Sequence, residues 1–149
     1  MEVTIRPMEK EDRESVIGMM RVFYASDAVL GEYDDSVFER DFDDCTGACP
    51  FVEGYVFEVC GETAGYSMEA MSYSTEEGGL CLWVEDLYVR PGYRGKGISS
   101  QFFSFLEREY GDRVRRIRLE VEADNVTARR VYDREGYEIL PYEQRKKSL

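Results

Sequence analysis

Residues 80–110 of the chain read LCLWVEDLYVRPGYRGKGISSQFFSFLEREY, and this stretch decides the fold class. Residues 80–89 are apolar at most positions, which is typical of a strand buried on both faces of a sheet. Residues 90–97 hold three glycines and one proline, which is too many for regular structure. From Ile98 to about Tyr110, apolar side chains recur at helical spacing. The stretch therefore predicts a buried strand, a glycine-rich loop and a helix.

The sequence on both sides of this stretch continues the alternation of strands and helices. Hydrophobic periodicity, turn residues and capping residues set the expected boundaries. We expect a strand at 3–8, helices at 9–26 and 36–44, a hairpin of 55–59 with 64–71, a strand at 117–121, a helix from the cap Asn125 to Gly136, and closing strands at 137–140 and 143–147. The order strand, helix, helix, three strands, helix, strand, helix and two strands indicates one mixed α/β (α+β) domain.

Length and charge limit the classes of protein that the chain can belong to. Its 149 residues predict a single domain over 1–149, and 43% hydrophobic residues supply a core. With 19 Lys and Arg against 31 Asp and Glu, the formal charge is −12. That charge disfavours binding to nucleic acid or to an anionic membrane surface, because both depend on cationic side chains. A cationic partner is favoured instead.

The chain contains no histidine and four cysteines. The absence of histidine excludes an imidazole general base and a Ser-His-Asp triad. Cys45, Cys49, Cys60 and Cys81 form no CxxC pair, so no metal site is expected. No signal segment precedes the first strand, and no apolar run reaches the roughly 20 residues of a membrane helix. We therefore expect reduced cysteines and a cytoplasmic protein.

The glycine-rich loop has the composition of an anion-binding site. A strand, a glycine loop and a helix aim backbone N–H groups and the positive end of the helix dipole at one point. Arg94 and Lys96 add cations there. The sequence does not match the Walker motif, because Gly97 follows Lys96 where the motif needs serine or threonine. It does not match the dinucleotide-binding motif GxGxxG either, because Ser100 stands at the position of the last glycine.

The loop resembles the acetyl-CoA loop of the GCN5-related N-acetyltransferases (GNAT family), Arg/Gln-x-x-Gly-x-Gly/Ala. Here the motif reads from Arg94 to Ser99, and Ser99 departs from it only in being a small residue other than glycine or alanine. The resemblance includes the preceding segment 85–91 and resumes at Asn125-x-x-Ala128-x-x-x-Tyr132. The order of predicted elements also matches the family along essentially the whole chain.

The resemblance implies a mixed, mostly antiparallel sheet flanked by helices, with acetyl-CoA as co-substrate and no metal. By this resemblance, amides of residues 94–100 bind the pyrophosphate, main-chain groups of 87–89 pair with the pantetheine arm, and Asn125 hydrogen-bonds that arm. The implied cofactor-binding residues are Leu87, Tyr88, Val89, Arg94, Gly95, Lys96, Gly97, Ile98, Ser99, Ser100 and Asn125.

Two residues are predicted to carry the chemistry of an N-acetyltransferase. Glu85 lies in an apolar strand, where burial raises the pKa of a carboxyl group towards that of a general base. It is either the base or an anchor for the substrate ammonium, and Asp86 has a structural or substrate-contact role. The resemblance places the Tyr132 hydroxyl near the CoA sulfur as general acid. Cys81 is disfavoured as a nucleophile because no histidine activates it.

The acidic segment 31–44 precedes the sheet where the family places one wall of the acceptor cleft. It favours a cationic amine: a polyamine, an aminoglycoside, a lysine side chain or an N-terminal amine. The alternatives are a catalytically silent CoA-binding regulatory module and a nucleotide-binding module. The sequence leaves open the acceptor, the length of the acyl group and the oligomeric state, with a homodimer as one expectation.

Overall fold

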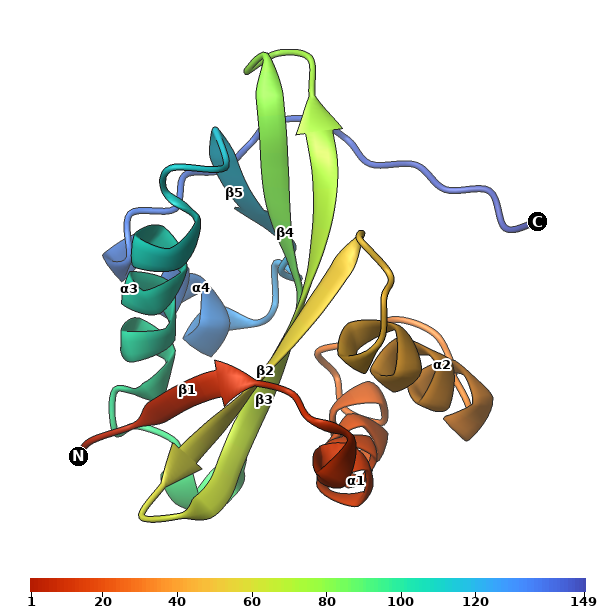
Figure 1. Cartoon of the computed structure of the whole chain (residues 1–149). Coiled ribbons are helices and arrows are strands. Elements are labelled where there is room, and N and C mark those ends of the chain that lie inside the picture. Colours follow the sequence, from red (N-terminus) through yellow and green to blue (C-terminus); the bar gives the residue numbers. More distant parts are fainter.

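A computed structural model describes all 149 residues and shows one five-stranded sheet (Figure 1). The strands are β1 (Thr4–Pro7), β2 (Val52–Val59), β3 (Glu62–Ser74), β4 (Gly79–Val89) and β5 (Arg116–Leu119). They lie in the order β1-β2-β3-β4-β5. All neighbours pair antiparallel except β4 and β5, which are parallel. The predicted mixed, mostly antiparallel sheet is confirmed.

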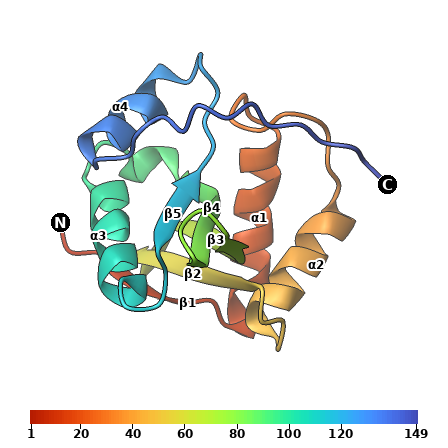
Figure 2. The same ribbon diagram turned by 90° about the horizontal axis from the view of Figure 1, so that it is seen from above.

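Two helices cover each face of the sheet (Figures 1 and 2). On one face lie α1 (Arg13–Tyr24) and α2 (Asp35–Thr46); on the other lie α3 (Ile98–Tyr110) and α4 (Val126–Arg134). Each pair encloses its own apolar cluster against the sheet. None of these helices combines the length and apolar character needed to span a membrane. All four cysteines are free in this structure.

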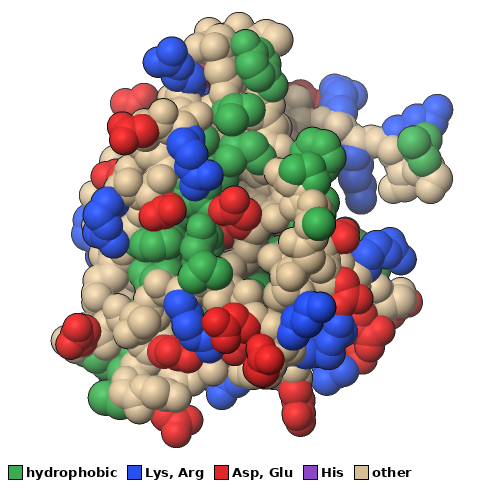
Figure 3. Space-filling view, in the orientation of Figure 1, with side chains coloured by type: hydrophobic (Ala, Val, Ile, Leu, Met, Phe, Trp, Pro, Cys, Tyr) green, Lys and Arg blue, Asp and Glu red, His purple; other side chains and the backbone are tan.

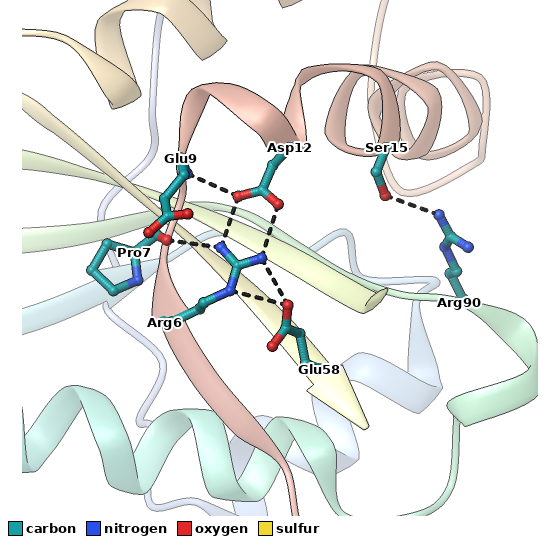
Figure 4. A network of polar contacts seen from close by, with 7 residues as sticks. All are labelled: Arg6, Pro7, Glu9, Asp12, Ser15, Glu58 and Arg90. Atoms are coloured by element: carbon teal, nitrogen blue, oxygen red, sulfur yellow. Dashed lines mark hydrogen bonds and ion pairs between the residues drawn. The ribbon is translucent and has the colours of Figure 1, made fainter. Parts of the chain in front are cut away.

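The Arg6 side chain joins β1, β2 and the start of α1 (Figure 4). Its Nη1 and Nη2 atoms donate to the two carboxylate oxygens of Asp12, at 2.8 and 2.9 Å. Its Nε and Nη2 atoms donate to Oε1 of Glu58, at 3.0 and 2.7 Å. The hydrogen bonds from Arg6 lower the pKa of Asp12. This bridge fixes the N-terminal end of α1 relative to the sheet, and therefore fixes the direction in which α1 runs.

The prediction of two closing strands is wrong in this structure. Residues 137–149 form no strand, and the only main-chain hydrogen bond within them runs from Tyr142 N–H to the Leu140 carbonyl. The expected hairpin had Pro141 and Tyr142 as its two-residue loop. Such loops adopt turn types that need a positive φ at the first position. Proline fixes φ near −65°, so Pro141 prevents this hairpin.

Candidate active site

The two parallel strands separate in the middle of the sheet. β4 pairs with β5 only from Cys81 to Val84, opposite residues 116–119. β4 then continues to Val89 with β3 on one side and no strand on the other. The main-chain groups on that edge of residues 85–89 are therefore open to a ligand, which can pair with them as an added strand would.

The glycine-rich loop that follows β4 has a shape that other residues strain to adopt. Gly95 and Gly97 have φ values of +70° and +80°, in the left-handed region that favours glycine. Gly97 is also the residue that caps the start of α3. The N–H groups of residues 95–100 donate no hydrogen bond within the protein. Six consecutive donors at the positive end of a 13-residue helix form an anion cradle.

A pocket of about 990 Å³ connects this cradle with the open edge of β4. Ten of the eleven residues predicted to bind the cofactor line it: Leu87, Tyr88, Val89, Arg94, Gly95, Gly97, Ile98, Ser99, Ser100 and Asn125. The pocket is completed by the end of α1 and by one side of α4, including Val22, Phe23, Val131 and Tyr132. The donors and the open strand edge fit an elongated ligand that carries a pyrophosphate and an amide-bearing arm.

The two cations of the loop have different orientations. The Nε atom of Arg94 donates to the Val89 carbonyl at 2.7 Å, and the guanidinium lies over the Tyr88 ring. Arg94 therefore lies on the pocket wall. Lys96 does not line the pocket, because its Nζ atom donates to the Gly92 carbonyl at 3.0 Å and lies over the Tyr93 ring. Only the main chain of Lys96 belongs to the anion cradle.

Tyr132 lies on α4 with its ring edge-on to Phe103, at 5.9 Å between ring centroids. Burial raises the pKa of its hydroxyl, so the group carries its proton at neutral pH. No hydrogen bond within the protein involves that hydroxyl. A protonated hydroxyl in the wall of the pocket, without a partner, has the properties of a proton donor to a bound ligand.

Asn125 begins α4, as the sequence predicts. Its Oδ1 atom accepts a hydrogen bond from the N–H of Ala128 at 3.2 Å. This is the geometry of an N-cap, in which a side-chain oxygen satisfies an N–H group that the helix leaves free. Asn125 also lines the pocket, and its amide nitrogen donates no hydrogen bond within the protein.

Glu85 occupies a β-bulge. Met68 of β3 pairs with Asp86, and the next residue, Glu69, pairs with Val84, so Glu85 has no partner on β3. The bulge places this exposed side chain where β4 leaves β5. Partial desolvation is the main cause of its raised pKa, and the carboxylates of Glu120 and Asp41 raise it further. Glu85 does not line the cofactor pocket.

Asp86 points to the opposite side, towards α1. Its Oδ1 atom accepts from the Tyr24 hydroxyl at 2.7 Å, and its Oδ2 atom accepts from the Tyr66 hydroxyl at 2.9 Å. Only 3% of the residue is exposed, which leaves no room for direct contact with a substrate. Burial raises its pKa to about 6, although the two tyrosines act against the rise. Of the two roles left open by the sequence, the structure supports the structural one.

The structure adds functional candidates that the sequence did not single out. Arg134 lines the pocket, and its Nη2 atom donates to the Ser100 hydroxyl at 3.3 Å, beside the anion cradle. Glu120, directly after β5, raises the pKa of Glu85 across the opening between the strands. Neither residue belongs to a recognisable motif. Only the parallel pairing of β4 with β5 indicates that Glu120 approaches Glu85.

This geometry agrees with the result of sequence comparison. The acetyltransferase (GNAT) family is matched over residues 17–137. The chain therefore belongs to the GNAT acetyltransferase family.

Individual relatives agree with this class. The chain is 40% identical over 63 residues to thialysine N-epsilon-acetyltransferase of Bos taurus, a match that covers 37% of the chain and 36% of that enzyme. The chain thus matches about a third of the length of this relative.

Solved structures share the fold. A possible acetyltransferase from Clostridium difficile 630 superposes with a TM-score of 0.84 at 19% identity, covering 99% of this chain and 97% of the other. Aminoglycoside N-acetyltransferase AAC(6')-Iy in complex with CoA superposes with a TM-score of 0.82 at 16% identity, covering 99% and 95%.

Proposed function

We propose that the protein is an N-acetyltransferase that moves an acetyl group from acetyl-CoA to a cationic primary amine. The observation that carries the proposal is one pocket that joins the anion cradle, the open edge of β4 and the unpartnered hydroxyl of Tyr132. A regulatory module would need the cradle but would not need a protonated, unpartnered hydroxyl in the wall of the same pocket.

Donor binding rests on groups of the main chain. The N–H groups of residues 95–100 hold the pyrophosphate, and Arg94 and Arg134 add positive charge beside it. The open edge of residues 87–89 pairs with the amides of the pantetheine arm. Acetyl-CoA supplies the acetyl group as a thioester, at the place where β4 leaves β5.

Acid–base work is divided between Glu85 of β4 and Tyr132 of α4. Glu85 accepts the proton that the acceptor ammonium must lose, directly or through water, and the neutral nitrogen attacks the acetyl carbonyl. N–H groups of β4 stabilise the negative charge that develops on the carbonyl oxygen. Tyr132 donates its proton to the sulfur as the carbon–sulfur bond breaks. The C–N bond forms as the nitrogen attacks, and once the carbon–sulfur bond has broken the nitrogen releases its remaining extra proton to solvent, from which Tyr132 regains a proton. No covalent enzyme intermediate is required.

The charges around Glu85 support a cationic acceptor. Glu120 and the half-buried Asp41 of α2 both act on the pKa of Glu85, so three carboxylates from three elements share one region. Such a field attracts an ammonium group and stabilises it before it loses a proton. The bovine relative, whose name denotes acetylation of the ε-nitrogen of thialysine, agrees with a side-chain amine as acceptor.

The experiment that tests the proposal is an acetyl-transfer screen over polyamines, aminoglycosides, amino acids and peptide amines. Release of CoA is followed in parallel with acetyl-CoA binding by calorimetry. Turnover with cationic amines, and less with neutral ones of equal size, is expected. Binding of acetyl-CoA without turnover on any amine would favour the regulatory module, and ATP binding in its place would favour the nucleotide module.

A further inference from the structure

Arg118 is a half-buried cation of β5 that has no partner within the protein. Elsewhere on this acidic chain, basic side chains lie among acidic ones (Figure 3). Ile117 and Leu119 pack against the apolar cluster that includes α3, so Arg118 lies on the other face of the sheet. There its guanidinium lies 4.3 Å from the ring centroid of Trp83, in β4. No hydrogen bond or ion pair involves this side chain, which leaves the N–H donors of a stacked guanidinium free.

Arg118 lines a second pocket, of about 870 Å³, that meets the cofactor pocket at Tyr132, since Tyr132 lines both. Two other guanidinium groups line this second pocket, and both are already used within the protein. Arg116 forms ion pairs with two glutamates in the turn between β3 and β4, and Arg129 donates to a main-chain carbonyl at 2.9 Å. Arg118 is therefore the guanidinium of this pocket that can bind an anion without giving up an existing polar contact.

Glu85 and Glu120, two of the carboxylates proposed to attract the acceptor amine, lie close to this guanidinium. Trp83 and Arg118 are opposite each other in the pairing of β4 with β5. Glu85 follows Trp83 by two residues, and Glu120 follows Arg118 by two residues. The Glu120 carboxylate raises the pKa of Glu85, so the two acids lie near each other. Because two residues of a strand span about 7 Å, the positive group and the pair of negative groups are separated by about that distance.

Opposite charges at this separation select among cationic amines. A polyamine carries only cations, so its second ammonium group would meet the like charge of Arg118. A carboxylate instead accepts two parallel hydrogen bonds from a guanidinium. In lysine, a four-carbon stem separates the side-chain ammonium from the α-carbon that bears the carboxylate, and such a stem spans the distance from Arg118 to Glu85 when extended. The α-ammonium adjoins the carboxylate and does not reach Glu85.

We propose that the acceptor is a free diamino acid, bound with its carboxylate on Arg118 and acetylated on its side-chain amine beside Glu85. The inference rests on the proposed function and narrows its acceptor from cationic amines in general to zwitterionic ones. Trp83 holds the guanidinium flat, with the edge that carries its N–H groups turned to the ligand. The transfer is the one described above: the C–N bond forms, the carbon–sulfur bond breaks, CoA leaves as the thiol, and one proton passes to solvent.

The first test compares lysine with cadaverine, which is lysine without its carboxylate. The wild type should have a kcat/KM for lysine at least about tenfold higher, and mass spectrometry should place the acetyl group on the side-chain nitrogen. Arg118→Gln should lower kcat/KM for lysine by about 10- to 100-fold and should not lower that for cadaverine. Arg118→Lys keeps the charge without the paired donors, so its loss should be smaller. Arg130→Gln is the matched control, because exposed Arg130 lines neither pocket, and should behave as the wild type.

Calorimetry of the CoA-loaded protein with lysine separates this inference from the proposed function. Arg118→Gln should keep the circular dichroism and acetyl-CoA affinity of the wild type, because Arg118 does not line the cofactor pocket, and should bind lysine at least about tenfold more weakly. That weakening without turnover of any amine would support the carboxylate site and overturn acetyl transfer. Equal kcat/KM for lysine and cadaverine in the wild type, equal losses for both in Arg118→Gln, or acetylation of the α-nitrogen would overturn the diamino acid as acceptor and leave acetyl transfer intact.

Discussion

The hydroxyl of Tyr24, in α1, donates a 2.7 Å hydrogen bond to Oδ1 of Asp86, in β4. The Tyr66 hydroxyl, in β3, donates a hydrogen bond to Oδ2 of Asp86. Asp86 therefore links α1, β3 and β4 at the position next to Glu85 in the chain. Because the carboxylate is buried, it titrates close to neutral pH, with a pKa of about 6. This link therefore connects the stability of the fold to pH in the range where acetyl transfer is expected to operate.

Asp86→Asn should flatten part of the pH dependence of stability. The pKa of Asp86 is raised from 3.8 to about 6 on folding, so the folded state binds more protons between these values. Protonated Asp86 therefore contributes about 3 kcal/mol to the free energy of unfolding below about pH 4, and this contribution is lost as the pH rises through about 6. Denaturant unfolding at several pH values measures this loss.

The variant should lack this loss, because its amide does not ionise. Exposed Asp112, changed to Asn, is the matched control and should keep the wild-type profile. An Asp86→Asn profile parallel to that of the wild type would show that the carboxylate does not control stability in this range.

Gly97→Ala should weaken acetyl-CoA binding by distorting the anion cradle. A Cβ at Gly97 meets no atom within 4 Å, so the cost comes only from its φ of +80°. Holding a residue other than glycine in this region costs about 1–2 kcal/mol. If the loop changes conformation to avoid this strain, the affinity for acetyl-CoA should fall roughly tenfold.

Gly92→Ala is the control for this substitution, because Gly92 has no positive φ and equal space around it. Calorimetry with acetyl-CoA should show wild-type affinity for Gly92→Ala. If both variants lost the same amount of affinity for acetyl-CoA, general stiffness of the loop, rather than the geometry of the anion cradle, would set that affinity.

Tyr132→Phe should lower kcat and leave the Kd for acetyl-CoA nearly unchanged. The ring packs on Phe103, and phenylalanine preserves that contact, whereas the hydroxyl makes no hydrogen bond within the protein. Loss of a general acid reduces turnover by about 10²–10⁴-fold. A pre-steady-state assay of thiolate release with a saturating amine measures the effect directly. Unchanged turnover would remove Tyr132 from the chemistry.

Local sequence signals predicted the elements that frame the pocket. The bounds of α3, Ile98 and Tyr110, and the capping role of Asn125 follow from neighbouring residues alone, and both are confirmed. The glycine-rich loop could also be predicted from local sequence, because the positive φ values at Gly95 and Gly97 depend on residue type.

Contacts between distant segments could not be predicted in the same way. The contact of Tyr24 with Asp86 joins residues 62 apart in the chain, and the bulge at Glu85 depends on how β3 pairs with β4. The closing strands were expected from their composition. The proline between them, rather than the strand residues themselves, decided against a hairpin.

Glu85→Gln should separate the two roles left open for this carboxylate. If Glu85 is the base, kcat of the wild type rises with pH through the raised pKa of Glu85, and the variant loses that rising limb. If Glu85 only anchors the ammonium, the variant raises KM for a cationic amine and keeps the limb. We expect the loss of the limb.

Glu120→Gln provides an independent check, because the carboxylate of Glu120 raises the pKa of Glu85 without replacing it. Its removal lowers the pKa of Glu85, so the rising limb should move to lower pH while kcat at the plateau is retained within a few-fold. Full pH–rate profiles for wild type, Glu85→Gln and Glu120→Gln, measured with one saturating amine, show both effects. A limb that stays in place in Glu120→Gln and persists in Glu85→Gln would assign the titration to another group, such as the amine itself.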